Sequence, residues 1–368
     1  MTSFRTLLSV SAVLLLSAST NATVNNLFSG SSPSCSLNGT LCPPPPWPAQ
    51  WNLTLSTVCQ PSSSGYFIPP INEPWGLVSL DWSVAESIWN NQTDKNSSNC
   101  EAVSVKGCQL IKQASPGSRC FIYHNMELAL QWLESQRAVM YDPTKKNYFL
   151  LTPDGNIYNE PRGEGDQFFW NFTNPEAADY YVSSVIATLS DPAVDGTFTD
   201  DVTGVPAEHP EVQAKCNMTD AELATLQYNT QLTNARLIEG LVSAGKYNWQ
   251  AWGAQDGTGS GISKNSCSNW LNARCGYSTN PQASFTMGFD SSNAEQSVAA
   301  FLIVRPAIAY LGFGWESDMR DWNSIFTLQV GEPQSGCYQS APGVYTRAWT
   351  YGNVTLDCNS WTATIPHA

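Results

Sequence analysis

Two adjacent carboxylates, Asp200 and Asp201, end a short apolar run near the middle of the chain. The run from 194 to 204 reads VDGTFTDDVTG, and its Thr, Phe and Val residues favour an extended backbone. Charge is costly inside a strand, so the sequence predicts that a strand ends at this pair, and the carboxyl ends of parallel strands are where α/β proteins bind ligands. Because side chains alternate along a strand, we expect only one of the two aspartates to point along its inner face. Adjacent carboxylates suit proton transfer, although capping of the next loop or helix is the alternative interpretation.

Other polar side chains follow predicted strands, and aromatic side chains accompany them. The polar residues are Asp81, Asn125, Gln250 and Glu316, and the aromatic ones are Tyr123, Trp170, Trp252 and Trp315. Cleavage of a glycosidic bond requires two carboxylates, while amides and aromatic rings bind sugar hydroxyls and sugar faces. We therefore predict catalytic roles for Asp200, Asp201 and Glu316, and substrate binding by the others. Asp81 is the alternative to Glu316 as the acid, and each Trp is equally explained as a core residue.

The elements that must position these side chains alternate between strand-like and helix-like patterns. Strands are expected at 77–82, 120–125, 167–172, 194–201, 247–252, 284–289 and 310–315. Helices are expected at 83–89, 126–140, 177–189, 220–244 and 294–309, the last with a kink at Pro306. Seven or eight such repeats over about 260 residues predict an α/β fold of the (β/α)8 TIM barrel type. A doubly wound open sheet gives the same local pattern, but no Gly-rich phosphate loop follows the first strand.

Four segments divide the chain. Residues 1–22 read as a signal peptide, because Arg5 precedes an apolar run and small residues. Residues 23–70 form a Cys/Pro-rich N-terminal arm, for which a linker from a lost binding module is the alternative. The barrel, as the catalytic domain, is expected at 71–322, and a small C-terminal β extension at 323–368.

Cysteines and glycosylation sequons both point to export. The mature part holds 11 cysteines, so at least one is left out of an intramolecular pair. Short separations suggest the disulfides Cys35–Cys42, Cys100–Cys108, Cys267–Cys275 and Cys337–Cys358, although connectivity is not deducible from sequence. Asn-x-Ser/Thr sequons occur at Asn38, Asn52, Asn91, Asn96, Asn171, Asn217 and Asn353, and a further one at Asn21. We predict a secreted glycoprotein, extracellular or in the cell wall.

Charge and missing motifs exclude several function classes. A net charge of −14 argues against nucleic acid and anionic membranes as partners. The three histidines form no two-His metal spacing, and neither a Gly-x-Ser-x-Gly element nor a nucleotide-binding Gly-rich loop is present. We therefore predict no cofactor and no metal, a carbohydrate substrate, and a monomer.

Several stretches resemble the glycoside-hydrolase-like barrel proteins found in microbes, over about 76 to 315. The matching stretches are WNFTNPEAADYY at 170–181, VDGTFTDD at 194–201, LQVGEP at 328–333 and VYTR at 344–347. The resemblance implies a glycosidase barrel. In the α-amylase-like pattern the last Asp of the central segment is the nucleophile, which corresponds to Asp200, but that pattern has Arg where this chain has Phe198. A chitinase pattern needs Glu at the position of Val202.

The leading hypothesis is thus a glycoside hydrolase that acts on a polysaccharide or glycan by a two-carboxylate mechanism. A catalytically silent carbohydrate-binding glycoprotein on the same barrel is the alternative. A disulfide-rich structural wall protein is a third possibility, but the chain lacks the repeats expected for it.

Overall fold

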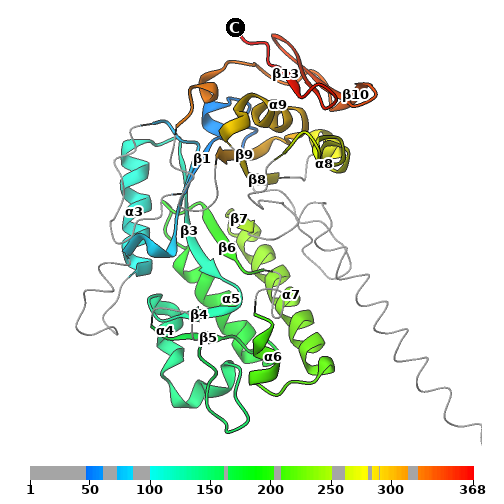
Figure 1. The fold of residues 1–368 in the computed structure, drawn as a ribbon. Coiled ribbons are helices and arrows are strands. Elements are labelled where there is room, and N and C mark those ends of the chain that lie inside the picture. The colour runs from blue at the N-terminus through cyan, green and yellow to red at the C-terminus, as the bar shows by residue number, and fades with distance from the viewer. Residues whose placement is uncertain are drawn as a thin grey trace, which may run out of the picture.

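A parallel β-sheet forms the centre of the molecule (Figure 1). The computed structural model describes residues 47–60, 73–85, 100–160, 165–202, 209–250, 262–280, 284–289, 291–313 and 322–368, with only the backbone of Gln250 and 284–288. Five strands run parallel in the order β1-β2-β3-β6-β7. They are β1 (Val58–Cys59), β2 (Leu77–Leu80), β3 (Arg119–Asn125), β6 (Gly196–Asp200) and β7 (Tyr247–Gln250). The predicted α/β class is confirmed, and the sheet begins with a strand inside the range expected for the arm.

A second parallel pair continues this sheet on the β1 side. Strands β8 (Ser284–Phe289) and β9 (Ile308–Phe313) pair in parallel, and a parallel bridge joins Thr57 to Leu311. Tyr310 of β9 and Tyr247 of β7 belong to the same buried cluster, so side chains from both ends of the strand order share one apolar layer. Within the described ranges no pairing joins β7 to β8, and a closed eight-stranded barrel is not detected.

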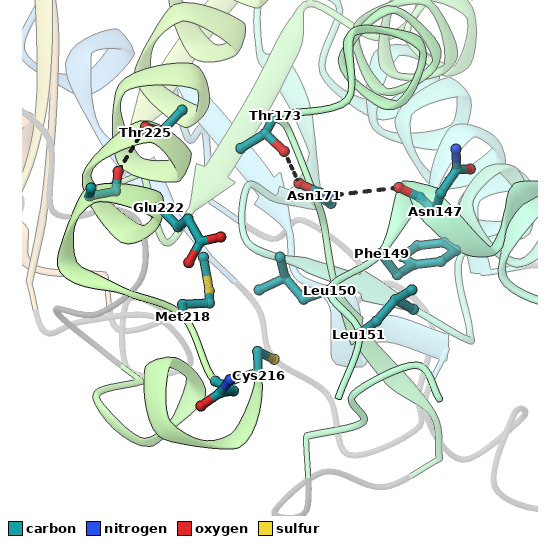
Figure 2. A pocket seen from close by; sticks show the side chains of 12 residues that line it. Asn147, Phe149, Leu150, Leu151, Asn171, Thr173, Cys216, Met218, Glu222 and Thr225 are labelled. Atoms are coloured by element: carbon teal, nitrogen blue, oxygen red, sulfur yellow. Dashed lines mark hydrogen bonds between the residues drawn. The ribbon is translucent and has the colours of Figure 1, made fainter. Parts of the chain in front are cut away.

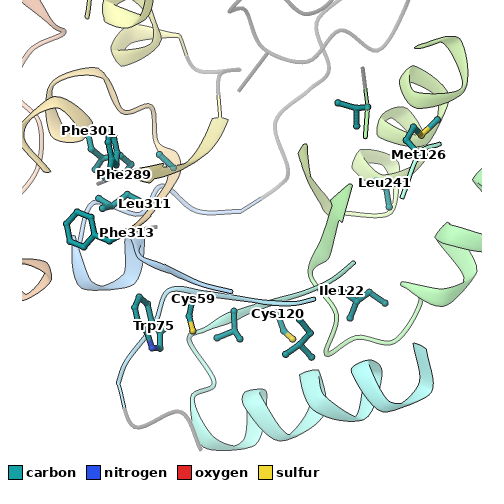
Figure 3. Close-up of a cluster of buried hydrophobic side chains, with 14 of the residues drawn as sticks. Cys59, Trp75, Cys120, Ile122, Met126, Leu241, Phe289, Phe301, Leu311 and Phe313 are labelled. Atoms are coloured by element: carbon teal, nitrogen blue, oxygen red, sulfur yellow. The ribbon is translucent and has the colours of Figure 1, made fainter. Parts of the chain in front are cut away.

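Each face of the sheet carries its own apolar layer. On the outer face, Cys120 and Ile122 of β3 pack with Trp75 and with residues of the covering elements (Figure 3). On the inner face, Phe121, Tyr123 and Phe198 belong to a separate buried cluster. Parallel register places β3 and β6 side chains level with one another, with Tyr123 opposite Phe198 and Asn125 opposite Asp200. The inner layer therefore supports the polar groups at the strand ends.

Trp47 closes the inner layer where these strands begin. Its ring centroid lies 5.7 Å from that of Tyr247 and 6.4 Å from that of Phe121. The Arg119 guanidinium stacks over it at 4.3 Å. This end of the sheet is filled by side chains, so a ligand site on the inner face is more naturally expected at the opposite, carboxyl end.

Helices flank the sheet and the connections at the carboxyl ends of its strands, and local capping signals explain where two of them begin. They are α3 (Cys100–Ala114), α4 (Glu134–Met140), α5 (Pro175–Thr188), α6 (Glu211–Lys215), α7 (Asp220–Ser243), α8 (Cys267–Arg274) and α9 (Ala294–Val304). A capping box between Thr219 and Glu222 starts α7, and Asn174 caps α5 ahead of a proline. Pro306 follows α9 instead of kinking it, because β9 begins two residues later. No helix in the described part of the chain is both long and apolar enough to cross a membrane.

A short antiparallel strand pair replaces the first half of the helix predicted at 126–140. Strands β4 (Leu128–Leu130) and β5 (Gln167–Phe169) pair antiparallel, outside the parallel sheet. Polar side chains take the amides that a helix would use: Asn125 Oδ1 accepts from Leu128 N, and Gln136 Oε1 accepts from Leu130 N. The apolar residues whose spacing suggested a helix are buried in this strand pair instead.

The C-terminal residues form an antiparallel sheet. Its strands are β10 (Tyr338–Ala341), β11 (Val344–Trp349), β12 (Gly352–Asp357) and β13 (Thr362–Thr364). Arg347 of β11 donates to the carbonyl oxygens of Arg305 at 2.6 Å and of Ser278 at 3.2 Å. Burial lowers the pKa of this guanidinium to about 10, so it remains charged at neutral pH while it links the sheet to the end of α9 and to the 3-10 turn after α8.

Three predicted disulfides are wrong. The structure pairs Cys108–Cys120, Cys267–Cys358 and Cys275–Cys337, while Cys35–Cys42 lies outside the described residues. Two of these bonds join α8 and the turn after it to the C-terminal sheet, at separations of 91 and 62 residues. The short separations used for the prediction did not reflect this long-range packing. Cys216 is a free thiol, whose pKa burial raises to about 11.

Candidate functional site

Strand β6 delivers Asp200 and Asp201 to the carboxyl end of the parallel sheet. Gly196 starts this strand where a Cβ atom would lie 2.1 Å from the carbonyl oxygen of Tyr247, so only glycine fits. Asp200 closes the strand, and Asp201 leaves it with a positive φ of 49°, which Asp tolerates better than most residues. Both side chains are partly exposed. The predicted end of the strand is therefore confirmed at this pair.

Side chains of β3 hold both carboxylates. The Tyr123 hydroxyl donates to Asp200 Oδ2 at 3.0 Å, and Asn125 Nδ2 donates to Asp201 Oδ2 at 2.6 Å. The expectation that only one aspartate serves this face is wrong, because the turn at Asp201 brings its carboxylate back toward β3. The two acids thus form one cluster at the strand end.

The orientation of Asn125 is fixed from several sides. Its Oδ1 accepts from the backbone amides of Glu127 at 2.8 Å and Leu128 at 2.7 Å, so its Nδ2 must point to the site. That Nδ2 also donates to the Tyr123 hydroxyl at 3.0 Å. Tyr181 of α5 donates to the Asn125 carbonyl oxygen at 2.9 Å. Asn125 is therefore a rigid element that positions both neighbours.

Tyr123 is held in its protonated form. Burial, and then the charges of Asp200 and Asp201, raise the pKa of its phenol well above the usual range. The phenol can therefore act only as a donor to Asp200 at ordinary pH. Tyr123 and Asn125 are 6% and 2% exposed, so they support the carboxylates more than they offer a surface to a substrate.

Asp81 is a third carboxylate near the same strand ends. It follows β2 directly, is buried, and accepts from the Ser83 hydroxyl at 2.9 Å. Its charge contributes to the raised pKa of Tyr123, which shows that it lies near the cluster. The structure thus brings Asp81, Asp200 and Asp201 around Tyr123.

The remaining predicted site residues divide into two groups. Trp170 is 2% exposed and packs on Phe172 and Tyr181, so its ring is part of the core behind the site. Gln250 ends β7 with only its backbone described. Trp252, Trp315 and Glu316 lie outside the described residues.

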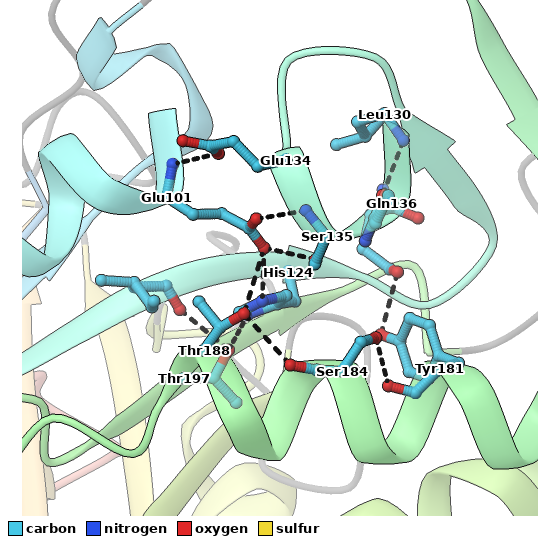
Figure 4. Close-up of polar contacts among 12 residues, drawn as sticks. Glu101, His124, Leu130, Glu134, Ser135, Gln136, Tyr181, Ser184, Thr188 and Thr197 are labelled. Atoms are coloured by element: carbon cyan, nitrogen blue, oxygen red, sulfur yellow. Dashed lines mark hydrogen bonds and ion pairs between the residues drawn. The ribbon is translucent and has the colours of Figure 1, made fainter. Parts of the chain in front are cut away.

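Glu101, His124 and Thr197 form a buried Glu–His–Thr set (Figure 4). Its members lie in the order of a catalytic triad, but their contacts indicate a structural role. His124 Nδ1 lies 3.1 Å from Thr197 Oγ1, and its Nε2 lies 3.6 Å from Glu101 Oε1. Thr197 already donates to the carbonyl oxygen of Ile122, and His124 is 0% exposed. Glu101 also accepts two bonds from Ser135, one from its amide and one from its hydroxyl, at 2.6 Å each. The set therefore ties α3 and α4 to the sheet.

A cavity of about 510 Å³ is lined by residues between 147 and 173 and by residues around the start of α7 (Figure 2). Its lining includes Leu150, Cys216, Met218 and the sequon residues Asn171 and Asn217. Thr173 donates to Asn171 Oδ1 at 2.5 Å within its sequon. None of the predicted site residues belongs to the lining of this cavity.

The sequence did not indicate one cluster beside the carboxylates. It lies where the connections after β3 and β6 approach the antiparallel pair of β4 and β5, and it consists of Glu127, Glu160, His209 and Glu211. The only sequence signal was the scarcity of histidine, which makes each His conspicuous. No spacing in the chain relates these four residues.

No protein-family model matches the chain, and no curated protein matches it. Among solved structures it is similar to a GH31 dextranase of Flavobacterium johnsoniae, at 13% identity and a TM-score of 0.42, over 69% of this chain and 34% of that one. It is also similar to a cycloalternan-degrading enzyme of Trueperella pyogenes, at 12% identity and a TM-score of 0.42, over 75% and 44% of the two chains. An α-N-acetylgalactosaminidase of Bifidobacterium bifidum aligns at 11% identity and a TM-score of 0.39, over 78% and 49%. The alignment spans under half of each enzyme, and similarities this distant leave the function to be argued from the residues.

Proposed function

We propose that this protein is a secreted glycoside hydrolase that cleaves glycosidic bonds in a polysaccharide or glycan. The observation that carries the proposal is the pair Asp200 and Asp201, fixed by Tyr123 and Asn125 at the carboxyl end of a parallel sheet. Two carboxylates at this place, in a chain of acidic charge without nucleotide motifs, fit glycosidic cleavage better than the other hydrolytic chemistries considered.

Asp200 takes the role of nucleophile or base in this proposal. Its Oδ2 accepts from Tyr123 and its Oδ1 accepts from the Asp201 amide at 3.0 Å, so the carboxylate is held in one orientation. Hydrogen bonds to the charged form favour ionisation, which a nucleophile or base requires. Asp201 modulates the charge of Asp200 from the adjacent position.

The second carboxylate is assigned to Glu316 first and to Asp81 second. Glu316 follows β9 by three residues, and an adjacent Trp ring would favour its protonated form. Asp81 is supported by its burial and by its influence on Tyr123. Separations of about 5 Å between the carboxyl groups predict retention of anomeric configuration, and about 6.5–9.5 Å inversion.

The finer architecture belongs to the same proposal. The seven parallel strands of the described residues follow the chain in a ring, in the order β8-β9-β1-β2-β3-β6-β7, which supports a barrel of the (β/α)8 type with its eighth strand between β7 and β8. Glycans at the sequons and removal of residues 1–22 on export complete the proposal. The described sequon residues Asn52, Asn217 and Asn353 are exposed and Asn171 is partly exposed, which is compatible with glycosylation.

The test is a comparison of Asp200→Asn with the wild type on a panel of polysaccharides and aryl glycosides. Asp154→Asn is the matched control, because it makes the same change in an exposed turn of the 151–157 hairpin. We expect Asp200→Asn to lose at least about 10³-fold in kcat while it remains folded. Retention of the rate in Asp200→Asn would contradict the assignment. Binding of glycans by the wild type without turnover on any panel member would favour the silent carbohydrate-binding protein.

A further inference from the structure

One imidazole and three carboxylates gather beside the candidate site. Glu127 follows β3, Glu160 lies in the strand-like segment before β5, and His209 and Glu211 follow β6. The side chains of Glu127, Glu160 and His209 are 0%, 4% and 9% exposed, and that of Glu211 is 38% exposed. Three separate connections thus supply one compact cluster of ionisable groups.

The spacing of three of these groups suits a metal ion. His209 Nδ1 lies 3.2 Å from Glu160 Oε2 and 3.6 Å from Glu211 Oε1. Ligand atoms of a tetrahedral zinc site, with bonds of about 2.1 Å, lie roughly 3.4 Å apart. The three candidate ligand atoms are all within 4.8 Å of one another, so a small movement of the partly exposed Glu211 completes the set.

The second nitrogen of the imidazole gives an independent indication. His209 Nε2 lies 3.8 Å from Glu127 Oε2. A metal-bound histidine usually donates its other N–H to a carboxylate, which fixes the tautomer and the ring plane. Phe169 packs against the same ring at 4.9 Å and an interplanar angle of 79°. The backbone of Glu127 is itself fixed, because its carbonyl oxygen accepts from Trp170 N at 2.9 Å.

We propose that Glu160, His209 and Glu211 bind a divalent transition-metal ion of the zinc class, with Glu127 as the carboxylate that orients His209. The mixed nitrogen and oxygen donors favour such an ion over Ca²⁺, which takes six to eight oxygen ligands. With a neutral imidazole the four side chains carry three negative charges, and a dication reduces this to one. An imidazolium held by the same carboxylates is the arrangement that the test must exclude.

The position of the site gives the metal a structural consequence. His209 lies seven residues after Val202, which is buried next to Asp201, and Glu127 lies two residues after Asn125. A metal ion would therefore link the connection after β6 directly to the segment before β5. It would reach the connection after β3 through the contact of His209 with Glu127. This inference does not depend on glycosidase activity.

The test is calorimetric titration of the chelator-treated full-length protein with ZnCl₂ at pH 7, alongside CaCl₂. We expect one zinc equivalent and no comparable binding of calcium. His209→Gln should weaken binding by about 100-fold or more, and Glu127→Gln by about 10–100-fold. Glu211→Gln should weaken it by roughly tenfold and, being partly exposed, tests the site even if His209→Gln fails to fold.

Two control variants separate this site from adventitious zinc binding. Cys216→Ser removes a free thiol, and His367→Gln removes an exposed histidine near the C-terminus. Both should bind zinc as the wild type does. The proposal is overturned if the wild type binds no zinc, if Glu211→Gln and Glu127→Gln bind it unchanged, or if Cys216→Ser abolishes binding. Zinc affinity that falls as pH drops below about 6 would support it further, because the ligands must be deprotonated.

Discussion

Replacing Asn125 with Asp tests the geometry of the carboxylate cluster without a known substrate. Asn125 Oδ1 accepts from two backbone amides, so an aspartate would keep that oxygen in place. Its other oxygen would then occupy the position of Nδ2, which lies 2.6 Å from Asp201 Oδ2. Two ionised carboxylates cannot remain at that distance, so the folded variant must take up a proton or move the groups apart.

The protonation route sets the size of the effect. At an effective dielectric constant of 20, two charges 2.6 Å apart repel by about 6 kcal/mol. Keeping one ordinary aspartate protonated at pH 7 costs about 4 kcal/mol, which is the cheaper route. Because Asp201 is partly exposed, we discount this to a loss of about 2–4 kcal/mol in the free energy of unfolding.

The sign of the pH dependence follows from proton uptake. Between about pH 4 and pH 7 the folded variant holds a proton that its unfolded chain releases, so raising the pH destabilises it relative to the wild type. At pH 4 the extra proton is bound at little cost, and the part of the deficit due to charge falls below about 1 kcal/mol.

The assay is urea-induced unfolding at pH 4.5, 5.5 and 7, with Asn125→Leu as the control. Leucine removes every hydrogen bond of the Asn125 side chain without adding a carboxylate, so its deficit, whatever its size, should change little with pH. We expect the curves of Asn125→Asp and Asn125→Leu to diverge as the pH rises. If the deficit of Asn125→Asp were independent of pH, the close approach of Asn125 to Asp201 would be refuted.

Three further changes test other parts of the fold. Gly196→Ala places a methyl group 2.1 Å from the backbone oxygen of Tyr247, so we expect a loss of about 3 kcal/mol or more in urea unfolding, and a loss below about 1 kcal/mol would contradict this contact. Replacing Cys267 and Cys358 with Ser removes a disulfide that closes a loop of 91 residues. The free energy of unfolding should fall by at most about 4.6 kcal/mol, and by less while the second disulfide nearby remains. An unchanged melting temperature under non-reducing conditions would count against the pairing. Burial raises the pKa of Glu134 to about 7, so ionising its carboxyl group lowers the stability of the fold increasingly from pH 4.5 to 7 and fully above pH 7. Glu134→Gln should therefore gain about 1–2 kcal/mol in the free energy of unfolding at pH 8 and nothing at pH 4. Equal shifts of the melting temperature at the two pH values would refute this.

The parts of the fold that the sequence predicted are those determined by local signals. Strand β3 and helix α7 lie close to their expected ranges, because a buried apolar run identifies the strand and Gly245 marks the end of the helix. The end of β6 at Asp200 was predicted because charge disfavours a strand interior. Helix α3 was missed, since its sequence carries few large apolar residues and two cysteines suggested a loop.

The predicted roles of Tyr123 and Asn125 show where such reasoning stops. The sequence placed both at the carboxyl end of a strand beside the aspartates, which is where the structure has them. It assigned them to substrate binding, because exposure is a property of the folded surface and not of the strand pattern. Their burial instead makes them positioning residues for the two carboxylates.

The cluster around His209 could not be predicted, for a related physical reason. Its carboxylates come from residues 127, 160 and 211. The antiparallel pairing of β4 with β5 brings Glu160 to the imidazole. Strand β4 of this pair forms where the apolar spacing indicated a helix, so the error in secondary structure also hid the cluster. A segment at 126–130 wound as a helix would displace Glu127 from the bond that Trp170 N makes to its carbonyl oxygen. The hydrogen bonds of Asn125 that favour strand β4 over a helix therefore also determine where Glu127 contacts His209.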